Sequence, residues 1–137
     1  MFLDYDSIAE GDVIQPLKKE AVTQIQIARY AGASGDFNPI HLVPEYAREA
    51  GLEGTIAHGM LIMGMLGQMI SNWVGVKPVV KYGVSFKAMT KPGDKLTATG
   101  EVAKKYRLDD DNLLDANVRI ADEQDETKVE GKVTLRF

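Results

Sequence analysis

The segment from His58 to Trp73 constrains the fold most, because its apolar residues cover most of a helix circumference instead of one stripe. These residues are Met60, Leu61, Ile62, Met63, Met65, Leu66, Met69, Ile70 and Trp73. A helix that is apolar on all sides needs cover on several sides, so we expect it at the centre of the domain. At ~1.5 Å per residue it would span about 24 Å, the width of a small domain. Gly64 and Gly67 share one face, which indicates close approach of a sheet, the interpretation that we favour, or of a ligand's acyl chain.

The second half of the sequence predicts the cover for this helix. Apolar residues there recur with period two among strand formers, which predicts strands over 79–86, 96–106, 113–120 and 128–137. Polar turns separate the strands at 91–94, 109–112 and 122–125. Short turns favour antiparallel neighbours, so we expect a sheet curled around the helix. One flank of the helix would stay open, and a dimer partner is its expected cover.

The first half of the sequence is predicted to be mainly helical, after a brief strand over 12–17. Thr23 as N-cap and Gln26 three residues later form a capping box, which predicts a helix start. This helix is expected to end near Gly32 or Gly35. A second short helix is expected over 44–50, with a proline in its first turn. Helices followed by strands are typical of an α+β domain.

Composition excludes several classes of function. No repeat or linker divides residues 1–137, so we expect a single domain. The absence of cysteine excludes disulfides, thiolate metal sites and cysteine nucleophiles, and it fits a reducing, cytoplasmic location. The net charge of -4 and the scattered basic residues argue against nucleic acid as a partner. The acidic start, residues 1–6, does not fit a signal peptide, and the longest apolar stretch is shorter than the ~20 residues of a membrane span. We therefore expect a soluble protein with no membrane partner.

The two histidines are the natural places to look for chemistry. His58 begins the apolar helix, where a neutral imidazole could cap the helix or pack against the preceding turn, and we expect this structural role. His41 lies in a loop rich in Gly, Asn and Pro, five positions after Asp36. A bend at Asn38 could bring the carboxylate and the imidazole together, although Asp and Asn in such loops are commonly turn formers. Both interpretations stay open on these grounds.

Other catalytic classes find little support in the sequence. Structural zinc needs four protein ligands and catalytic zinc three, and the sequence offers too few histidines and no cysteine, so no metal is expected. The Gly-x-Ser-x-Gly motif of serine hydrolases and the phosphate-binding loops are missing.

Two motifs resolve the choice for the loop. Residues 30–41 read Tyr-Ala-Gly-Ala-Ser-Gly-Asp-Phe-Asn-Pro-Ile-His, and residues 57–60 read Ala-His-Gly-Met. Together they resemble the MaoC-like family of (R)-specific enoyl-thioester hydratases and dehydratases. The resemblance extends over 23–74, and the sequence from 84–86 through 92–94 is similar to the family's next strand and turn. It implies the hotdog fold, in which a long antiparallel sheet wraps a central helix and two such units pair.

The resemblance also implies the site. Asp36 and His41 are the implied catalytic pair, which holds and activates a water for syn addition to a trans-2-enoyl thioester of CoA or acyl carrier protein. The backbone N–H of Gly59 is implied to polarise the thioester carbonyl, which suits a helix N-terminus. Asn38, Gly59 and Met60 are the expected substrate-binding residues. No cofactor is expected.

One position departs from the family pattern. Some members carry a serine nine residues after the His of the His-Gly-Met motif, and this position is Gly67 here, which removes one polar contact to the substrate. The sequence also resembles the catalytic short subunit of split 3-hydroxyacyl-ACP dehydratases, so both a homodimer and a heterodimer with a related hotdog subunit are open.

Two alternative functions remain. One is an acyl-thioester-binding module without turnover, against which the intact Asp36 and His41 pair argues. The other is a hotdog thioesterase, in which the working carboxylate usually comes from the central helix. Residues 58–73 contain no acid.

Overall fold

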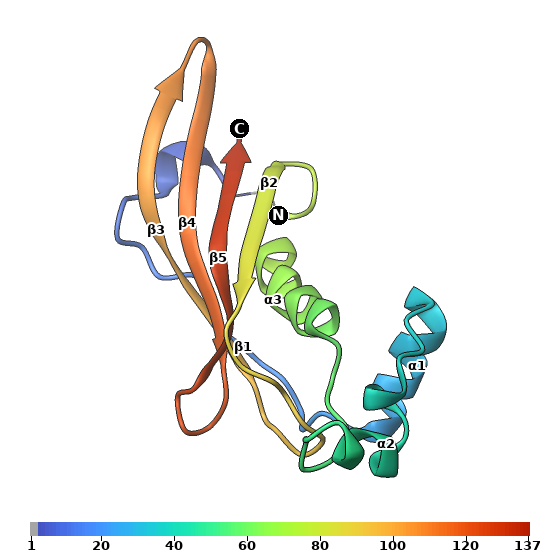
Figure 1. Cartoon of the computed structure of the whole chain (residues 1–137). Coiled ribbons are helices and arrows are strands. Elements are labelled where there is room, and N and C mark those ends of the chain that lie inside the picture. Colours follow the sequence, from blue (N-terminus) through green and yellow to red (C-terminus); the bar gives the residue numbers. More distant parts are fainter. Residues whose placement is uncertain (1–2) are drawn as a thin grey trace.

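A curled antiparallel sheet forms the body of the molecule in the computed structural model, which describes residues 3–137 (Figure 1). The strands are β1 (Leu17–Lys18), β2 (Val79–Phe86), β3 (Thr97–Leu108), β4 (Asp111–Ala121) and β5 (Thr127–Arg136). Their order is β1-β3-β4-β5-β2, so β2 pairs only with β5 and forms an edge of the sheet. The four long predicted strands are confirmed. Met1 and Phe2, the first residues of the acidic start, lie outside the described residues.

The turn between β3 and β4 is shorter than predicted. We expected a turn over 109–112, but β4 already begins at Asp111. Asp109 adopts a φ of 54°, in the left-handed region that Asp tolerates better than most residues. This conformation lets the chain reverse between Leu108 and Asp111, so residues of the predicted turn join the ladder.

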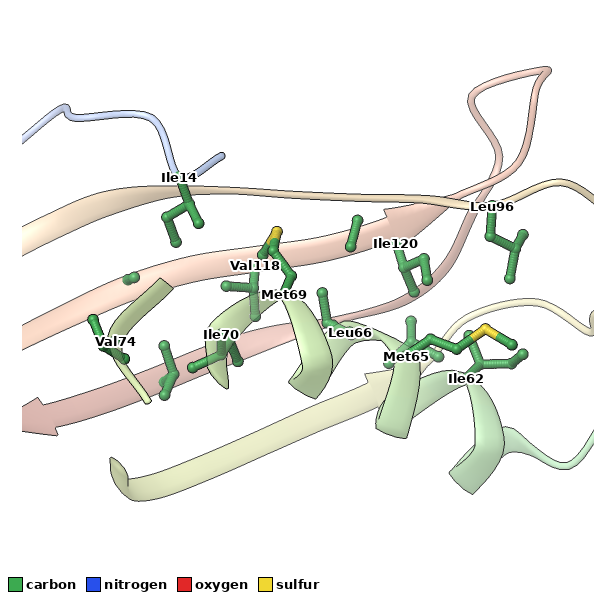
Figure 2. Packing of buried hydrophobic residues seen from close by; sticks show 14 of the residues in the cluster. Ile14, Ile62, Met65, Leu66, Met69, Ile70, Val74, Leu96, Val118 and Ile120 are labelled. Carbon is green, nitrogen blue, oxygen red and sulfur yellow. The ribbon is translucent and has the colours of Figure 1, made fainter. Parts of the chain in front are cut away.

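The central helix α3 (Gly59–Val74) packs against this sheet and provides much of the core (Figures 1 and 2). Its buried residues are Ile62, Met65, Leu66, Met69, Ile70 and Val74. In Figure 2 they meet side chains from the sheet, including Val118 and Ile120 of β4, and Leu96 just before β3. Leu66 has no exposed surface, and truncation of such a leucine to alanine typically costs about 3–5 kcal/mol of stability.

One face of α3 is not covered by any part of residues 3–137. Met60, Gly64, Gln68 and Asn72, four residues apart from one another, are all exposed. Within residues 3–137, the helix is therefore buried mainly on its sheet side. The open flank expected from the sequence lies along this row.

The two helical glycines differ in their surroundings. A Cβ atom built on Gly67 would lie 3.4 Å from Cε1 of Tyr82, which stands on β2. The Tyr82 hydroxyl also donates a hydrogen bond to the carbonyl oxygen of Met63 at 2.9 Å. The sheet thus contacts α3 at Gly67 through the Tyr82 ring, at an ordinary van der Waals distance, and the closer approach favoured from the sequence stays a prediction. Around Gly64 nothing lies within 4 Å of such a Cβ.

The predicted helices of the first half are confirmed as α1 (Gln24–Ser34) and α2 (Pro44–Glu49). The Thr23 hydroxyl caps α1 by accepting a hydrogen bond from the backbone N–H of Gln26 at 3.0 Å. Gly35 ends the helix with a φ of 76°, a conformation that glycine adopts at little cost. Figure 1 shows both helices at one end of the molecule, away from most of the sheet. Two short 3-10 turns, η1 (Tyr5–Ser7) and η2 (Pro39–His41), complete the elements.

The brief strand predicted over 12–17 is only partly present. Val13 forms a single bridge with Glu101, and β1 covers just Leu17–Lys18. Pro16 has no backbone N–H to donate, so it interrupts the ladder along the edge of β3. Within residues 3–137, no helix has the length and apolar character needed to cross a membrane.

Candidate active site

The loop between α1 and η2 is built from local side-chain hydrogen bonds. Asp36 accepts a bond from the backbone N–H of Asn38 through Oδ1 at 3.2 Å, and its own N–H donates to Ser34 Oγ at 3.2 Å. Asn38 in turn caps η2, because its Oδ1 accepts from the N–H of Ile40 at 3.2 Å. Short polar side chains of this kind stabilise tight turns. The consecutive turns bring His41 back toward Asp36.

The carboxylate and the imidazole meet at the end of this loop. Asp36 Oδ2 lies 3.8 Å from His41 Nε2, and the two side chains are 54% and 9% exposed, respectively. His41 Nδ1 lies 2.7 Å from the carbonyl oxygen of Ile56. Because a carbonyl oxygen only accepts, we assign the imidazole proton to Nδ1. Neutral His41 therefore directs the lone pair of Nε2 to the side where Asp36 lies.

His58 lies directly behind this pair. It is the N-cap residue of α3, but its side chain makes no capping hydrogen bond. Its ring instead stacks on the His41 ring, with centroids 3.8 Å apart and planes inclined by 23°. Its Nε2 lies 3.0 Å from the backbone carbonyl oxygen of Asp36. The structural role expected for His58 is thus carried by packing against the Asp36 loop rather than by capping.

The N-terminus of α3 opens onto a small cavity beside His41. This cavity has a volume of about 340 Å³, and its lining includes His41, Gly59, Ile62, Phe86, Met89 and Thr90. As the first residue of α3, Gly59 has a backbone N–H without an intrahelical acceptor. The Phe86 ring packs on Gly59 so closely that a Cβ there would lie 2.8 Å from Cδ1 of the ring. Any side chain at residue 59 would force this ring to move. Met60, the next residue, is exposed.

The potential metal ligands Asp36, His41 and His58 lie close together, with one ligand atom of each within 4.8 Å of the others. One nitrogen of each imidazole already faces a carbonyl oxygen. The rings are nearly parallel, and imidazole lone pairs lie in the ring plane, so the two free nitrogens do not point to one common position. This arrangement suits proton transfer better than metal coordination.

A protein-family model matches most of this chain. The model of the MaoC like domain matches residues 8–124, which include the loop, η2 and all of α3. This chain belongs to the MaoC-like family.

Known MaoC-like relatives are similar over part of their length. The chain is 34% identical over 86 residues to a mitochondrial 3-hydroxyacyl-[acyl-carrier-protein] dehydratase of Arabidopsis thaliana, a match that covers 63% of this chain and 51% of the relative. It is 35% identical over 79 residues to an (R)-specific enoyl-CoA hydratase of Aeromonas caviae, covering 56% and 59%. The chain thus matches just over half the length of these two relatives.

The fold agrees with solved MaoC-like structures over nearly the whole chain. An (R)-hydratase from A. caviae involved in PHA biosynthesis superposes with a TM-score of 0.83 at 27% identity, covering 96% of this chain and 98% of that one. The hotdog fold and the α+β class expected from the sequence are confirmed.

The structure adds one residue that the sequence motifs of the MaoC-like family did not indicate. Gln24, the first residue of α1, donates through Nε2 to the carbonyl oxygen of His41 at 2.8 Å. Its Oε1 accepts a hydrogen bond from the hydroxyl of Thr55, in the segment before α3. Gln24 thus ties η2 to that segment and fixes the backbone of His41. The sequence around Gln24 predicts only the first turn of a helix. It does not indicate this hydrogen bond, which joins residues 17 positions apart.

Proposed function

We propose that this protein catalyses the reversible hydration of trans-2-enoyl thioesters to (3R)-hydroxyacyl thioesters. The observation that carries the proposal is the approach of Asp36 Oδ2 to His41 Nε2 at 3.8 Å, beside the N-terminus of α3. The named activities of the relatives, hydration of an enoyl-CoA and dehydration of a 3-hydroxyacyl carrier protein, support the same chemistry. The protein would accordingly be a hydro-lyase.

The two side chains have complementary tasks in this reaction. A water oxygen bonds to the β-carbon of the thioester, and a proton must reach the α-carbon. His41, whose Nε2 lone pair is held in place by the bond from Nδ1 to Ile56, is suited to remove a proton from the water and, once protonated, to pass that proton to the α-carbon on the same face as the π bond breaks. The half-exposed Asp36 carboxylate accepts a hydrogen bond from the same water and orients it. Dehydration uses the same groups in reverse.

The start of α3 supplies the remaining requirement, which is stabilisation of negative charge on the thioester oxygen. The N-terminus of a helix carries partial positive charge, and the Gly59 N–H has no intrahelical acceptor there. A hydrogen bond from this group to the oxygen would be strongest when charge develops on it. Met60 and Asn38 stay predicted substrate contacts. The Asn38 amide oxygen already caps η2, so its support for the site includes fixing the loop.

The substrate carrier and the partner chain follow from the same proposal. CoA and acyl carrier protein are both proposed carriers, because the two relatives act on one each. A second hotdog subunit, identical or related, is proposed to cover the exposed row on α3, and the open edge of β2 offers unpaired backbone groups for such a contact. The single domain over residues 1–137, the cytoplasmic location and the absence of a cofactor stay predictions.

The experiment is the loss of enoyl-thioester absorbance with crotonyl-CoA and a longer 2-enoyl-CoA. Asp36→Asn is expected to reduce kcat at least 100-fold without a change in melting temperature, because the half-exposed carboxylate contributes little to packing. Asp110→Asn is the matched control, since Asp110 is fully exposed and lies in the β3–β4 turn. Near-normal turnover by Asp36→Asn would contradict the assignment, and a product of S configuration would contradict the stereochemistry.

The alternatives give different results in this assay. A binding module would retain the enoyl-CoA without loss of absorbance. A thioesterase would release free thiol, but the α3 segment Gly59–Val74 contains no acidic residue to drive that reaction.

A further inference from the structure

His58 is a buried N-cap residue whose side chain does not make a capping hydrogen bond. It is the N-cap of α3 and only 2% exposed, yet its side chain caps none of the helix N–H groups. An N-cap side chain that turns away from its helix leaves the first N–H groups of that helix without a side-chain acceptor. A buried polar ring in this position needs another set of contacts to account for it.

Those contacts lead to both members of the proposed catalytic pair. The His58 Nε2 atom donates to the carbonyl oxygen of Asp36 at 3.0 Å, and the His58 ring stacks on that of His41 at 3.8 Å. Tyr30, from α1, packs on the ring as well, with centroids 4.8 Å apart. The side chain that immediately precedes the central helix thus contacts the backbone of one catalytic residue and the ring of the other.

The hydrogen bond to Asp36 has particular weight because of where Asp36 lies. Gly35 has left the helix, and η2 begins only at Pro39, so Asp36 lies in a stretch without regular backbone pairing. Its side chain is half exposed and, among residues 3–137, accepts a single hydrogen bond, the local one from the N–H of Asn38, besides its 3.8 Å approach to His41 Nε2. The bond from His58 is the link between this stretch and the rigid start of α3.

The same bond fixes the protonation of the His58 ring. Because the Asp36 carbonyl only accepts, Nε2 carries the proton, and Nδ1 is left as a buried lone pair with no hydrogen-bond partner among residues 3–137. A second proton on Nδ1 would have no acceptor and would place a buried cation against His41. A neutral aromatic face therefore lies beside His41 when that ring takes up a proton during the reaction.

We propose that His58 is a positioning residue, which holds Asp36 through its backbone carbonyl and His41 through ring stacking so that both face the same water. This inference rests on the proposed function. His58 contacts the two catalytic residues and need not touch the substrate itself. Its loss should therefore lower kcat while leaving KM nearly unchanged, because a displacement of about 1 Å in a reacting group can cost roughly 100-fold in rate.

Two amide variants of His58 separate this role from simple filling of space. In His58→Gln the amide nitrogen reaches about as far as Nε2 and keeps the donor to Asp36, whereas in His58→Asn the side chain is one methylene shorter and loses it. We expect kcat of His58→Asn to fall about 100-fold with KM within threefold, and His58→Gln to stay within about tenfold of the wild type. Melting temperatures of both variants establish that they are folded.

The outcomes are distinct. Equal kcat values for the Gln and Asn variants, with both folded, would overturn the positioning role. So would a rise in KM without a fall in kcat. A ¹⁵N spectrum of the wild type that places the His58 proton on Nδ1 would overturn it without reference to activity. A wild-type protein that converts no enoyl thioester would overturn the proposed function, and the positioning role with it, whereas normal turnover by His58→Asn would overturn this inference alone.

Discussion

Gly131 on β5 lies unusually close to the backbone of β2, and replacing it with alanine tests how β2 is held. A Cβ atom at this residue would overlap the carbonyl oxygen of Gly83 and would lie 2.8 Å from Cα of Val84. Real Cβ atoms essentially never approach closer than 3.0 Å, so β2 and β5 would have to separate by about 1 Å at this point. Both contacts are with backbone atoms, which cannot rotate away as a side chain can.

The cost of this substitution follows from the pairing of the two strands. Separation would weaken the ladder that joins β2 to β5 on both sides of Gly131, and β2 has no other neighbour in the sheet. Overpacking against atoms that cannot yield costs about 3 kcal/mol. For a domain of this size that loss lowers Tm by roughly 10 °C. The proposed hydration activity should fall as well, because β2 carries Phe86, which packs on Gly59.

Gly83→Ala is the matched control, because it makes the same change on the facing strand. Nothing lies within 4 Å of a Cβ built on Gly83, so we expect stability equal to the wild type or higher by about 0.5 kcal/mol. The assay is denaturant unfolding followed by tryptophan fluorescence, together with enoyl-CoA hydration. If Gly131→Ala proves as stable as Gly83→Ala, the close approach of β2 and β5 is wrong.

Two further predictions concern stability. Burial raises the pKa of Tyr82 from 10.0 to about 12. The tyrosine therefore ionises at a lower pH in the unfolded chain than in the folded protein. The free energy of unfolding should be unchanged below pH 10 and should fall by about 1 kcal/mol as the pH rises to 12, a value that allows for the partial exposure of the side chain. Urea unfolding at pH 9 and pH 12 measures this, and Tyr82→Phe should reduce the difference by about that amount. Part of the difference should remain, because the pKa of Lys128, lowered by burial but raised more by its hydrogen bonds to Glu126 and Asp122, lies above its usual value and this side chain loses its charge in the same pH range. An undiminished difference in Tyr82→Phe would refute the role of Tyr82. The substitution Lys128→Met should lower the free energy of unfolding by about 3 kcal/mol. The buried Nζ lies 2.6 Å from Glu126 Oε1, 3.3 Å from Asp122 Oδ2 and 3.0 Å from the Met89 carbonyl oxygen, and these acceptors would lose their donor. Lys132→Met, outside that cluster on the same strand, should leave the urea midpoint nearly unchanged, and equal losses in both variants would refute the role of the cluster.

Short-range patterns determined the local structure well because their physical causes are local. The cap at Thr23 and the left-handed Gly35 set both ends of α1 as expected. The strand predicted over 12–17 failed for a reason that is partly long-range, since its pairing depends on the edge of β3 as well as on Pro16. Hydrophobicity indicated that α3 needs cover and that one flank stays open, but it does not record which chain covers that flank.

The features of the candidate active site also fall into those that local sequence determines and those that tertiary packing determines. The sequence by itself determined that Asp36 and His41 share a short loop, because turn-forming side chains act over two or three residues, and it determined that an apolar helix begins at His58. Only the tertiary structure decided that His58 stacks on His41, that Gln24 holds the His41 backbone and that Phe86 lies on Gly59. These contacts join residues 17 to 27 positions apart in the sequence. Packing of α1, α3 and β2 creates them, and no local preference of the chain encodes them.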